Sequence, residues 1–359
     1  MNRVLQTYLT RTFATQTLAC VAALTALLQA FDLLDNATDI LQRHLGIRGI
    51  GYYLALRLPT IIDQVLTIGV LIASIMTFRN LARHNEITIL RTAGITTYKM
   101  AILLLPVTTA IALFQFVLKD QITPRTERAL SVWWQATQLH DDNDDASIKP
   151  LWFRVGPCIV SVELVGGDGH LIEGVEIYWR ENSMLTRRVV AEHAEEKTGQ
   201  WLLRNAMETD LRDGVAISET PQDMVWQIKL SPQNLLRLTA PNARLSVSTA
   251  RDALNGSEAS SKTPSFYQMQ IYETCALPFA SFVMLLLGLP SAFSHSRDRG
   301  AARLPFVGAA MGLLFVLTTG ILISLGQAGT LPPFLAISTS FIVFGTIAAS
   351  QILLLEESV

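Results

Sequence analysis

The chain has 359 residues, of which 50% are hydrophobic and 16% are charged, and its mean hydropathy is +0.34. This composition excludes an ordinary soluble protein and fits a membrane protein with one sizeable polar part. The formal net charge of −2 gives no bulk attraction to nucleic acid. The three cysteines, Cys20, Cys158 and Cys275, match no metal or disulfide spacing.

The chain begins with a long apolar segment that follows two basic residues. Thr12–Leu34 comes after Arg3 and Arg11, and it lacks the small-residue cleavage signal of a secreted protein. It is also longer than the hydrophobic part of a signal peptide. We therefore predict an anchored first transmembrane helix.

Three acids close the first predicted helix, and three arginines follow in the short segment that connects it to the second. They are Asp32, Asp35, Asp39, Arg43, Arg48 and Arg57. The acids are spaced to share one face of a helix. The group is either a solvated, charge-balanced loop or the mouth of a polar path beside the membrane.

The second and third predicted spans, Leu58–Phe78 and Met100–Leu118, enclose the charged stretch Leu81–Gly94. This stretch is too short to cross a bilayer, but on a helical wheel Glu86 falls within an arc of apolar residues. An unpaired buried carboxylate is costly, so the pattern predicts a cation on another protein as its partner. The alternative is a helix on the membrane surface with Glu86 facing water. Gly94 is expected to end the helix.

Residues 119–265 contain no segment long enough to cross a bilayer. The acidic run 141–145 is expected to be a solvated loop, and Asn255–Ser265 to be a linker. Short alternating segments between them predict an antiparallel sandwich or jellyroll. These segments are Leu151–Val155, Cys158–Val165, Gly174–Trp179, Arg187–His193, Trp201–Ala206 and Met224–Leu230.

Three further spans follow the strand-rich part. They are predicted at Tyr272–Phe293, at Leu304–Leu325, and from Pro332 to near Leu355. The fifth contains Gly308 and Gly312, whose spacing permits close helix contact.

The distribution of lysine and arginine predicts the orientation in the membrane. Basic residues follow the second span (Arg79, Arg83, Arg91, Lys99) and the fourth (Arg297, Arg299, Arg303), whereas residues 326–330 contain none. The positive-inside rule then places both termini and Leu81–Gly94 in the cytoplasm. The strand-rich domain is outside, which in a bacterial cell is the periplasm. The three arginines of the first external loop weaken this asymmetry.

The sequence has no motif for catalysis or for binding a nucleotide phosphate. It lacks a Walker loop, the H-E-x-x-H pattern and the G-x-S-x-G pattern, and its six histidines are scattered. We predict no catalytic, cofactor or metal site, and we do not expect the chain to be an enzyme. Few ionisable residues lie in the spans, which argues against an ion-coupled transporter.

The layout and three local segments resemble the LptF/LptG permease family of the lipopolysaccharide export ABC transporter. Residues 83–94 resemble its coupling helix, Leu151–Val155 with Ile159–Glu163 resembles its opening periplasmic strands, and Leu331-Pro332-Pro333 is similar to the LptG type. The resemblance covers essentially the whole chain and is closer to LptG than to LptF.

The resemblance implies an α-helical membrane protein with six transmembrane helices and a periplasmic, jellyroll-like all-β domain between helices three and four. Residues 1–120 would hold helices one to three with a cytoplasmic coupling helix near 81–94, residues 121–265 the β-domain and its linker, and residues 266–359 helices four to six.

The resemblance also implies partners and a task. The chain would pair with a sister permease of LptF type, a dimeric cytoplasmic ATPase of LptB type and a periplasmic bridge protein of LptC/LptA type. It would extract lipopolysaccharide from the bacterial inner membrane, with ATP hydrolysis in the partner chain. Acyl chains would lie between the two half-transporters, with spans one and five as lateral gates.

Site residues follow from the same resemblance. The ATPase-coupling interface would comprise Arg83, Glu86, Ile87, Ile89, Leu90 and Arg91, and Gly308 and Gly312 would pack helices at the gate. The candidates for contact with the lipid headgroup are Asp32, Asp35, Arg43, Arg48 and Arg57. LptG-type proteins usually carry lysines at the outer end of span one, where residues 31–36 are acidic here. Either the arginines take that task or the headgroup differs, and a metal bridge through Asp32, Asp35 and Asp39 is a further alternative.

Two other functions are compatible with the sequence. One is a non-transporting membrane scaffold whose external β-domain binds envelope proteins, and the other is an exporter of a different lipid. Association with an ATPase distinguishes the scaffold, and the lipid that co-purifies distinguishes the exporter.

Overall fold

A computed structural model describes residues 2–43, 46–92, 94, 96–137, 150–166, 169–181, 184–197, 200–211, 217–218, 222–226, 228, 230–239, 244–256, 259–293 and 303–357. The chain divides into two compact units, Met1–Thr126 with Met269–Val359, and Glu127–Gln268. The acidic run 141–145 and two of the basic residues used for orientation, Arg297 and Arg299, lie outside the described residues.

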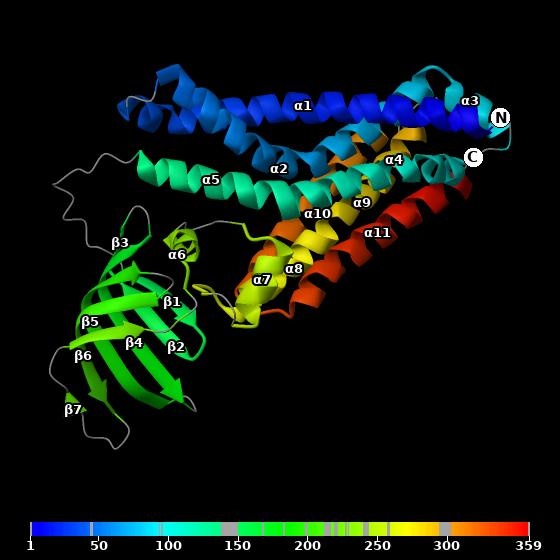
Figure 1. The fold of residues 1–359 in the computed structure, drawn as a ribbon. Coiled ribbons are helices and arrows are strands. Elements are labelled where there is room, and N and C mark those ends of the chain that lie inside the picture. Colours follow the sequence, from blue (N-terminus) through cyan, green and yellow to red (C-terminus); the bar gives the residue numbers. More distant parts are fainter. Residues whose placement is uncertain are drawn as a thin grey trace. The chain divides into compact units, whose positions relative to one another are not determined.

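The first unit is built of long helices (Figure 1). In chain order they are α1 (Asn2–Gln42), α2 (Gly46–Arg83), the short α3 (Glu86–Thr92), α4 (Thr97–Val117) with the π-turn η1 (Leu118–Ile122) and α5 (Thr123–Ala136), α8 (Pro264–Ala276), the 3₁₀ turn η2 (Leu277–Phe279), α9 (Ala280–Gly288), the 3₁₀ turn η3 (Leu289–Phe293), α10 (Leu304–Gln327) and α11 (Pro333–Glu357). Six helical segments of the described chain are long and apolar enough to cross a membrane, which confirms the predicted number.

Several helices extend well beyond their predicted spans. The first was predicted to begin at Thr12 and end at Leu34, yet α1 runs from Asn2 to Gln42. The third was predicted to end at Leu118, yet the helix continues through η1 and α5 to Ala136. Hydropathy marks only the part of a helix that can lie in lipid. The polar turns beyond that part remain helical because no glycine or proline interrupts them in α1.

The second and fourth spans form the interior of the helical unit. In the most apolar 18-residue window of each span, 61% of the residues are buried in the second span and 72% in the fourth. The corresponding shares are 17% in the first span and 22% in the fifth. The core of the unit contains Phe78 of α2 and Met284 of α9, with Leu104 of α4 and Phe315 of α10 packed in the same cluster. The spans α1 and α10 therefore present large apolar faces that the chain itself does not cover, and lipid or another subunit can contact them.

The second unit contains most of α5, one antiparallel β-sheet, two short helices and the first turn of α8. Its strands are β1 (Leu151–Val155), β2 (Cys158–Val162), β3 (Leu164–Val165), β4 (Leu171–Glu181), β5 (Met184–Lys197), β6 (Gln200–Asp210), β7 (Ile217–Ser218) and β8 (Gln222–Trp226), and its two short helices are α6 (Pro232–Thr239) and α7 (Val247–Leu254). The strand order is β1-β2-β4-β5-β6-β7, with β3 paired to β4 and β8 to β6. The inserted β-sheet domain between helices three and four is thus confirmed, although two short helices accompany its strands.

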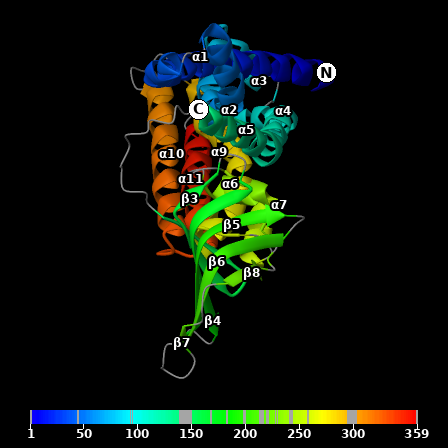
Figure 2. The ribbon, with the colours of Figure 1, turned by 60° about the vertical axis from the view of Figure 1, so that its left-hand side comes forward.

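The register places apolar side chains on one face of this sheet. Ile177 of β4 pairs with Val189 of β5, and Val175 pairs with Ala191. All four side chains are buried, because alternate residues of a strand point to the same face. The sheet curves around this core (Figure 2). The described strands belong to a single sheet, so the two stacked sheets of a sandwich are not present in this part of the chain.

Candidate functional site

The stretch Leu81–Gly94 was predicted to be one helix, but it is two helices separated by a turn. Helix α2 ends at Arg83 and α3 begins at Glu86. Between them Asn85 has a φ of 59°, a left-handed conformation that asparagine tolerates better than most residues and that ends a helix. The helical wheel therefore does not apply across this turn. The predicted end of the helix is confirmed, because Gly94 has a φ of +79° just after α3.

Helix α3 is anchored to its own chain by one of the apolar residues assigned to the ATPase interface. Ile87 is only 5% exposed and belongs to the core that contains Leu9 and Phe13 of α1. Leu90 is half-buried against the same core. Ile89 is 64% exposed, and Thr88 and Arg83 are also exposed. Ile89 is consequently the main apolar side chain that α3 presents outward.

The two charged residues of α3 contact different membrane helices. The Tyr8 hydroxyl of α1 donates a hydrogen bond to Glu86 Oε1 at 3.1 Å, and Figure 1 shows α3 beside the N-terminal end of α1. Arg91 lies over the Phe293 ring of η3, with its guanidinium carbon 5.1 Å from the ring centroid. Glu86 thus has a partner within the chain, which sequence reasoning missed because nothing local links Tyr8 to a residue 78 positions away.

The structure brings together two of the predicted headgroup candidates at the facing ends of α1 and α2. Asp32 Oδ1 accepts a hydrogen bond from Arg57 Nε at 3.1 Å, and Asp32 Oδ2 accepts one from the Tyr53 hydroxyl at 2.6 Å. The charges of Asp32 and Arg57 are therefore balanced locally.

Among the remaining headgroup candidates, Asp35 is near enough for its charge to act on Tyr53. Asp35, Asp39 and Arg48 are exposed, and Arg43 is half-buried. No three potential metal ligands lie together in the described part of the chain, so Asp32, Asp35 and Asp39 do not form a metal centre there. The pairing of Asp32 with Arg57 agrees with the charge-balanced alternative.

An apolar groove of about 690 Å³ runs between α1 and α2. Its lining includes Ala22, Ala26 and Leu33 of α1 and Leu54 and Leu58 of α2. The lining residues Leu33 and Leu54 are the chain neighbours of Asp32 and Tyr53, so one end of the groove lies beside the Asp32–Tyr53–Arg57 network. A groove with apolar walls and a polar end suits an amphiphile.

The groove also contains two polar side chains. Gln29 donates from Nε2 to the Leu54 carbonyl oxygen at 2.8 Å. Its Oε1 and the hydroxyl of Thr25 are buried and have no hydrogen-bond partner among the described protein atoms. Because such buried groups are costly when unsatisfied, they favour a ligand that brings its own polar groups into the groove.

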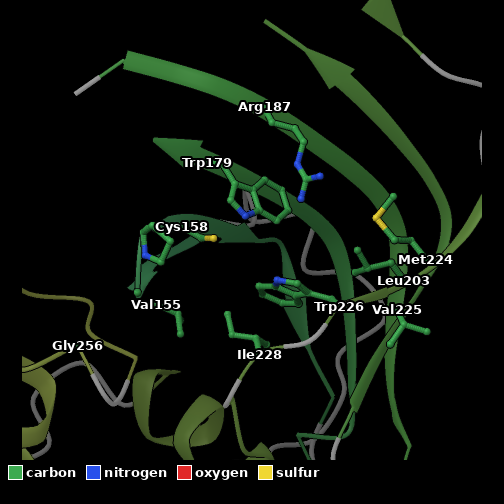
Figure 3. Close-up of a pocket in the computed structure, with 12 residues that line it drawn as sticks. Val155, Cys158, Trp179, Arg187, Leu203, Met224, Val225, Trp226, Ile228 and Gly256 are labelled. Atoms are coloured by element: carbon green, nitrogen blue, oxygen red, sulfur yellow. The ribbon is translucent and has the colours of Figure 1, made fainter. Parts of the chain in front are cut away.

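A second cavity of about 690 Å³ lies on the inner face of the β-sheet (Figure 3). Trp179, Trp226 and Met224 line it, and Arg187 lies over Trp179 with its guanidinium carbon 4.2 Å from the ring centroid. Arg187 also pairs with Glu208 at 2.9 Å. Burial raises the pKa of the Cys158 thiol in the wall to about 11, so this cysteine is neutral at physiological pH. Sequence reasoning predicted the strands but did not identify this cavity.

Comparison with known proteins identifies the family of the chain. A family model described as "Lipopolysaccharide export system permease LptF/LptG" matches residues 7–355. The chain belongs to the LptF/LptG permease family. The lipopolysaccharide export system permease protein LptG of Haemophilus influenzae is 21% identical over 273 residues, which cover 75% of this chain and 76% of that relative. The chain is thus an LptG-like, multi-pass inner-membrane permease of lipopolysaccharide export, as the sequence predicted.

In this LptG-like permease, the two glycines predicted to pack at a gate bring α10 close to other helices of the same chain. A Cβ atom at Gly308 would lie 2.7 Å from the Leu287 carbonyl oxygen of α9, and one at Gly312 would overlap the Leu71 side chain of α2. The close approach therefore serves packing inside the helical unit.

We expect Gly308→Ala to lower the stability of the permease, while Gly320→Ala does not. Nothing lies within 4 Å of a Cβ atom at Gly320, so this matched control gains helix propensity, worth up to about 1 kcal/mol. At Gly308 the obstacle is a backbone oxygen that cannot rotate away, and overpacking costs roughly 1–3 kcal/mol. Thermal unfolding of both variants in detergent checks this, and equal melting temperatures would contradict it.

Proposed function

We propose that this LptG-like permease extracts lipopolysaccharide from the inner membrane, driven by ATP hydrolysis in a separate cytoplasmic subunit. The observation that carries the proposal is the groove between α1 and α2. Its apolar wall suits an acyl chain, and the Asp32–Tyr53–Arg57 network at its end suits a polar headgroup. Opening the Asp32–Arg57 pair would free a guanidinium for a phosphate, which arginine binds through paired hydrogen bonds.

The proposed partners follow from the surfaces that the chain leaves uncovered. The exposed apolar faces of α1 and α10 suit a sister permease of LptF type. The exposed residues of α3, Arg83, Thr88 and Ile89, suit a dimeric cytoplasmic ATPase of LptB type. The cavity of the β-domain, with its two tryptophans and Arg187, suits lipid on its way to a periplasmic bridge protein of LptC/LptA type.

The orientation is part of this proposal, and cysteine labelling tests it. In a background without the three native cysteines, we expect Ala328→Cys to react with an impermeant reagent from the periplasm and Thr88→Cys only from the cytoplasm. Both positions are exposed, and the basic residues Arg79, Arg83, Arg91 and Lys99 lie on the Thr88 side. Reversed labelling would contradict both the orientation and the contact with the ATPase.

Reconstitution of the complex tests the function directly. The permease, its sister permease and the ATPase are placed in proteoliposomes that contain lipopolysaccharide, and lipid transfer to the purified bridge protein is measured with and without ATP. We expect transfer only with ATP. Failure of the ATPase to associate would favour the scaffold, and ATP-dependent transfer of another co-purified lipid in place of lipopolysaccharide would favour the alternative exporter.

A further inference from the structure

A buried ion pair joins the third and fourth membrane helices. Lys119 Nζ lies 2.6 Å from Glu273 Oε1, and the two side chains are only 5% and 16% exposed. A lysine near the end of a membrane helix ordinarily extends its amine toward water. Here the amine is directed into the protein instead, toward a carboxylate 154 positions away in the chain.

One partner lies in an irregular turn of its helix, and the other lies one turn before such a turn. Lys119 belongs to the π-turn η1, which separates α4 from α5. Glu273 lies one turn before η2, a 3₁₀ turn that contains Pro278. A π-turn contains an extra residue, so it changes the rotation of the helix that follows, and such turns occur frequently at functional sites. The ion pair thus links the π-turn of the third helix to the α-helical turn that precedes the Pro278 turn of the fourth.

The polar residues next to Lys119 are incompletely satisfied. Gln115 and Thr123, about one turn before and after Lys119, are 1% and 0% exposed. Gln115 donates to the Thr67 hydroxyl at 3.3 Å, but its Oε1 and the Thr123 hydroxyl have no hydrogen-bond partner among the described protein atoms. Such groups are costly when buried. Both of these groups lie within about one turn of the ion pair.

We propose that Lys119 and Glu273 are positioning residues for transport, a proposal that rests on the function proposed above. The pair holds the π-turn of the third helix against the Pro278 turn of the fourth. In the chain, the third helix leads into the inserted domain and the fourth begins where the chain returns from it. The pair makes these two helices turn together during a transport cycle.

The decisive variant replaces both charges with apolar side chains, Lys119→Met with Glu273→Leu. Replacing a buried ion pair in this way is often neutral or stabilising, so the variant separates stability from positioning. In the reconstituted complex we expect an unchanged melting temperature and continued ATP hydrolysis. Lipid released per ATP is expected to fall roughly fivefold, a typical effect of altered coupling. The single variant Lys119→Arg keeps the positive charge beside Glu273. We expect it to retain most of the parent's lipid release per ATP.

A second measurement does not depend on transport. Nitroxide labels at Gln121 and Tyr272, which are exposed, report the distance between the two helices. We expect one narrow distribution in the parent and a broader one in the double variant. An unchanged distribution, or wild-type lipid release per ATP, would overturn the proposal. If the double variant fails to assemble, Glu273→Gln takes its place, and loss of assembly in both would show a purely structural role.

If the parent complex transfers no lipid, the proposed function fails, and the label distances still decide the role of the pair.

Discussion

A complex that carries Glu86→Lys is expected to lose most of its ATPase subunit and its ATP-driven lipid transfer. Tyr8 binds Oε1 of Glu86, and Oε2 has no hydrogen bond or ion pair among the described residues, so we expect a cation of the ATPase to bind there. Truncating one partner of a buried interfacial charge pair typically costs roughly 2–5 kcal/mol. Glu86→Lys adds repulsion to this loss, so its effect should exceed that of Glu86→Ala.

Tyr8→Phe is the matched control for this prediction. It removes only the hydroxyl that binds Glu86, while Ile87 in the core and Arg91 over Phe293 still hold α3. We therefore expect the ATPase to remain bound in this variant. Co-purification of the ATPase at fixed salt concentration, followed by transfer assays, gives the measurement. Wild-type assembly and transfer with Glu86→Lys would show that Glu86 serves α1 alone or faces water.

Filling the groove between α1 and α2 should have the second large effect. Ala26 lines the groove, so the indole of Ala26→Trp would occupy space that an acyl chain needs. Displacing about three methylene groups, each worth ~0.8 kcal/mol when buried, corresponds to roughly fiftyfold weaker lipid binding. We expect lipid transfer to fall accordingly, with little change in assembly of the complex.

The control for the groove is Ala23→Trp, the same substitution on α1 outside the lining of the groove. It is expected to retain both bound lipid and transfer. The amount of lipopolysaccharide that co-purifies with each complex and the initial rate of ATP-driven transfer provide the comparison. Equal transfer by Ala26→Trp and the parent would exclude this groove from the lipid path.

The sequence by itself determined the membrane spans and the inserted strands. Apolar runs of the length needed to cross a bilayer have few other structures available, because unsatisfied backbone groups are too costly in lipid. Alternation of apolar and polar residues predicted strands such as Leu151–Val155 for an equally local reason. Gly94 likewise marked a helix end, because a positive φ is easier for glycine than for other residues.

Only the tertiary structure decided which side chains meet. The turn at Asn85 separates α2 from α3, so a single helical wheel could not place Glu86 correctly. The partner of Glu86 within the chain is Tyr8, which the sequence did not indicate. The same holds for Asp32 with Arg57 and for Lys119 with Glu273, whose partners lie on different helices. Periodicity shows which residues share a face of one helix. It does not show which face the next helix presents, because that depends on packing between residues far apart in the chain.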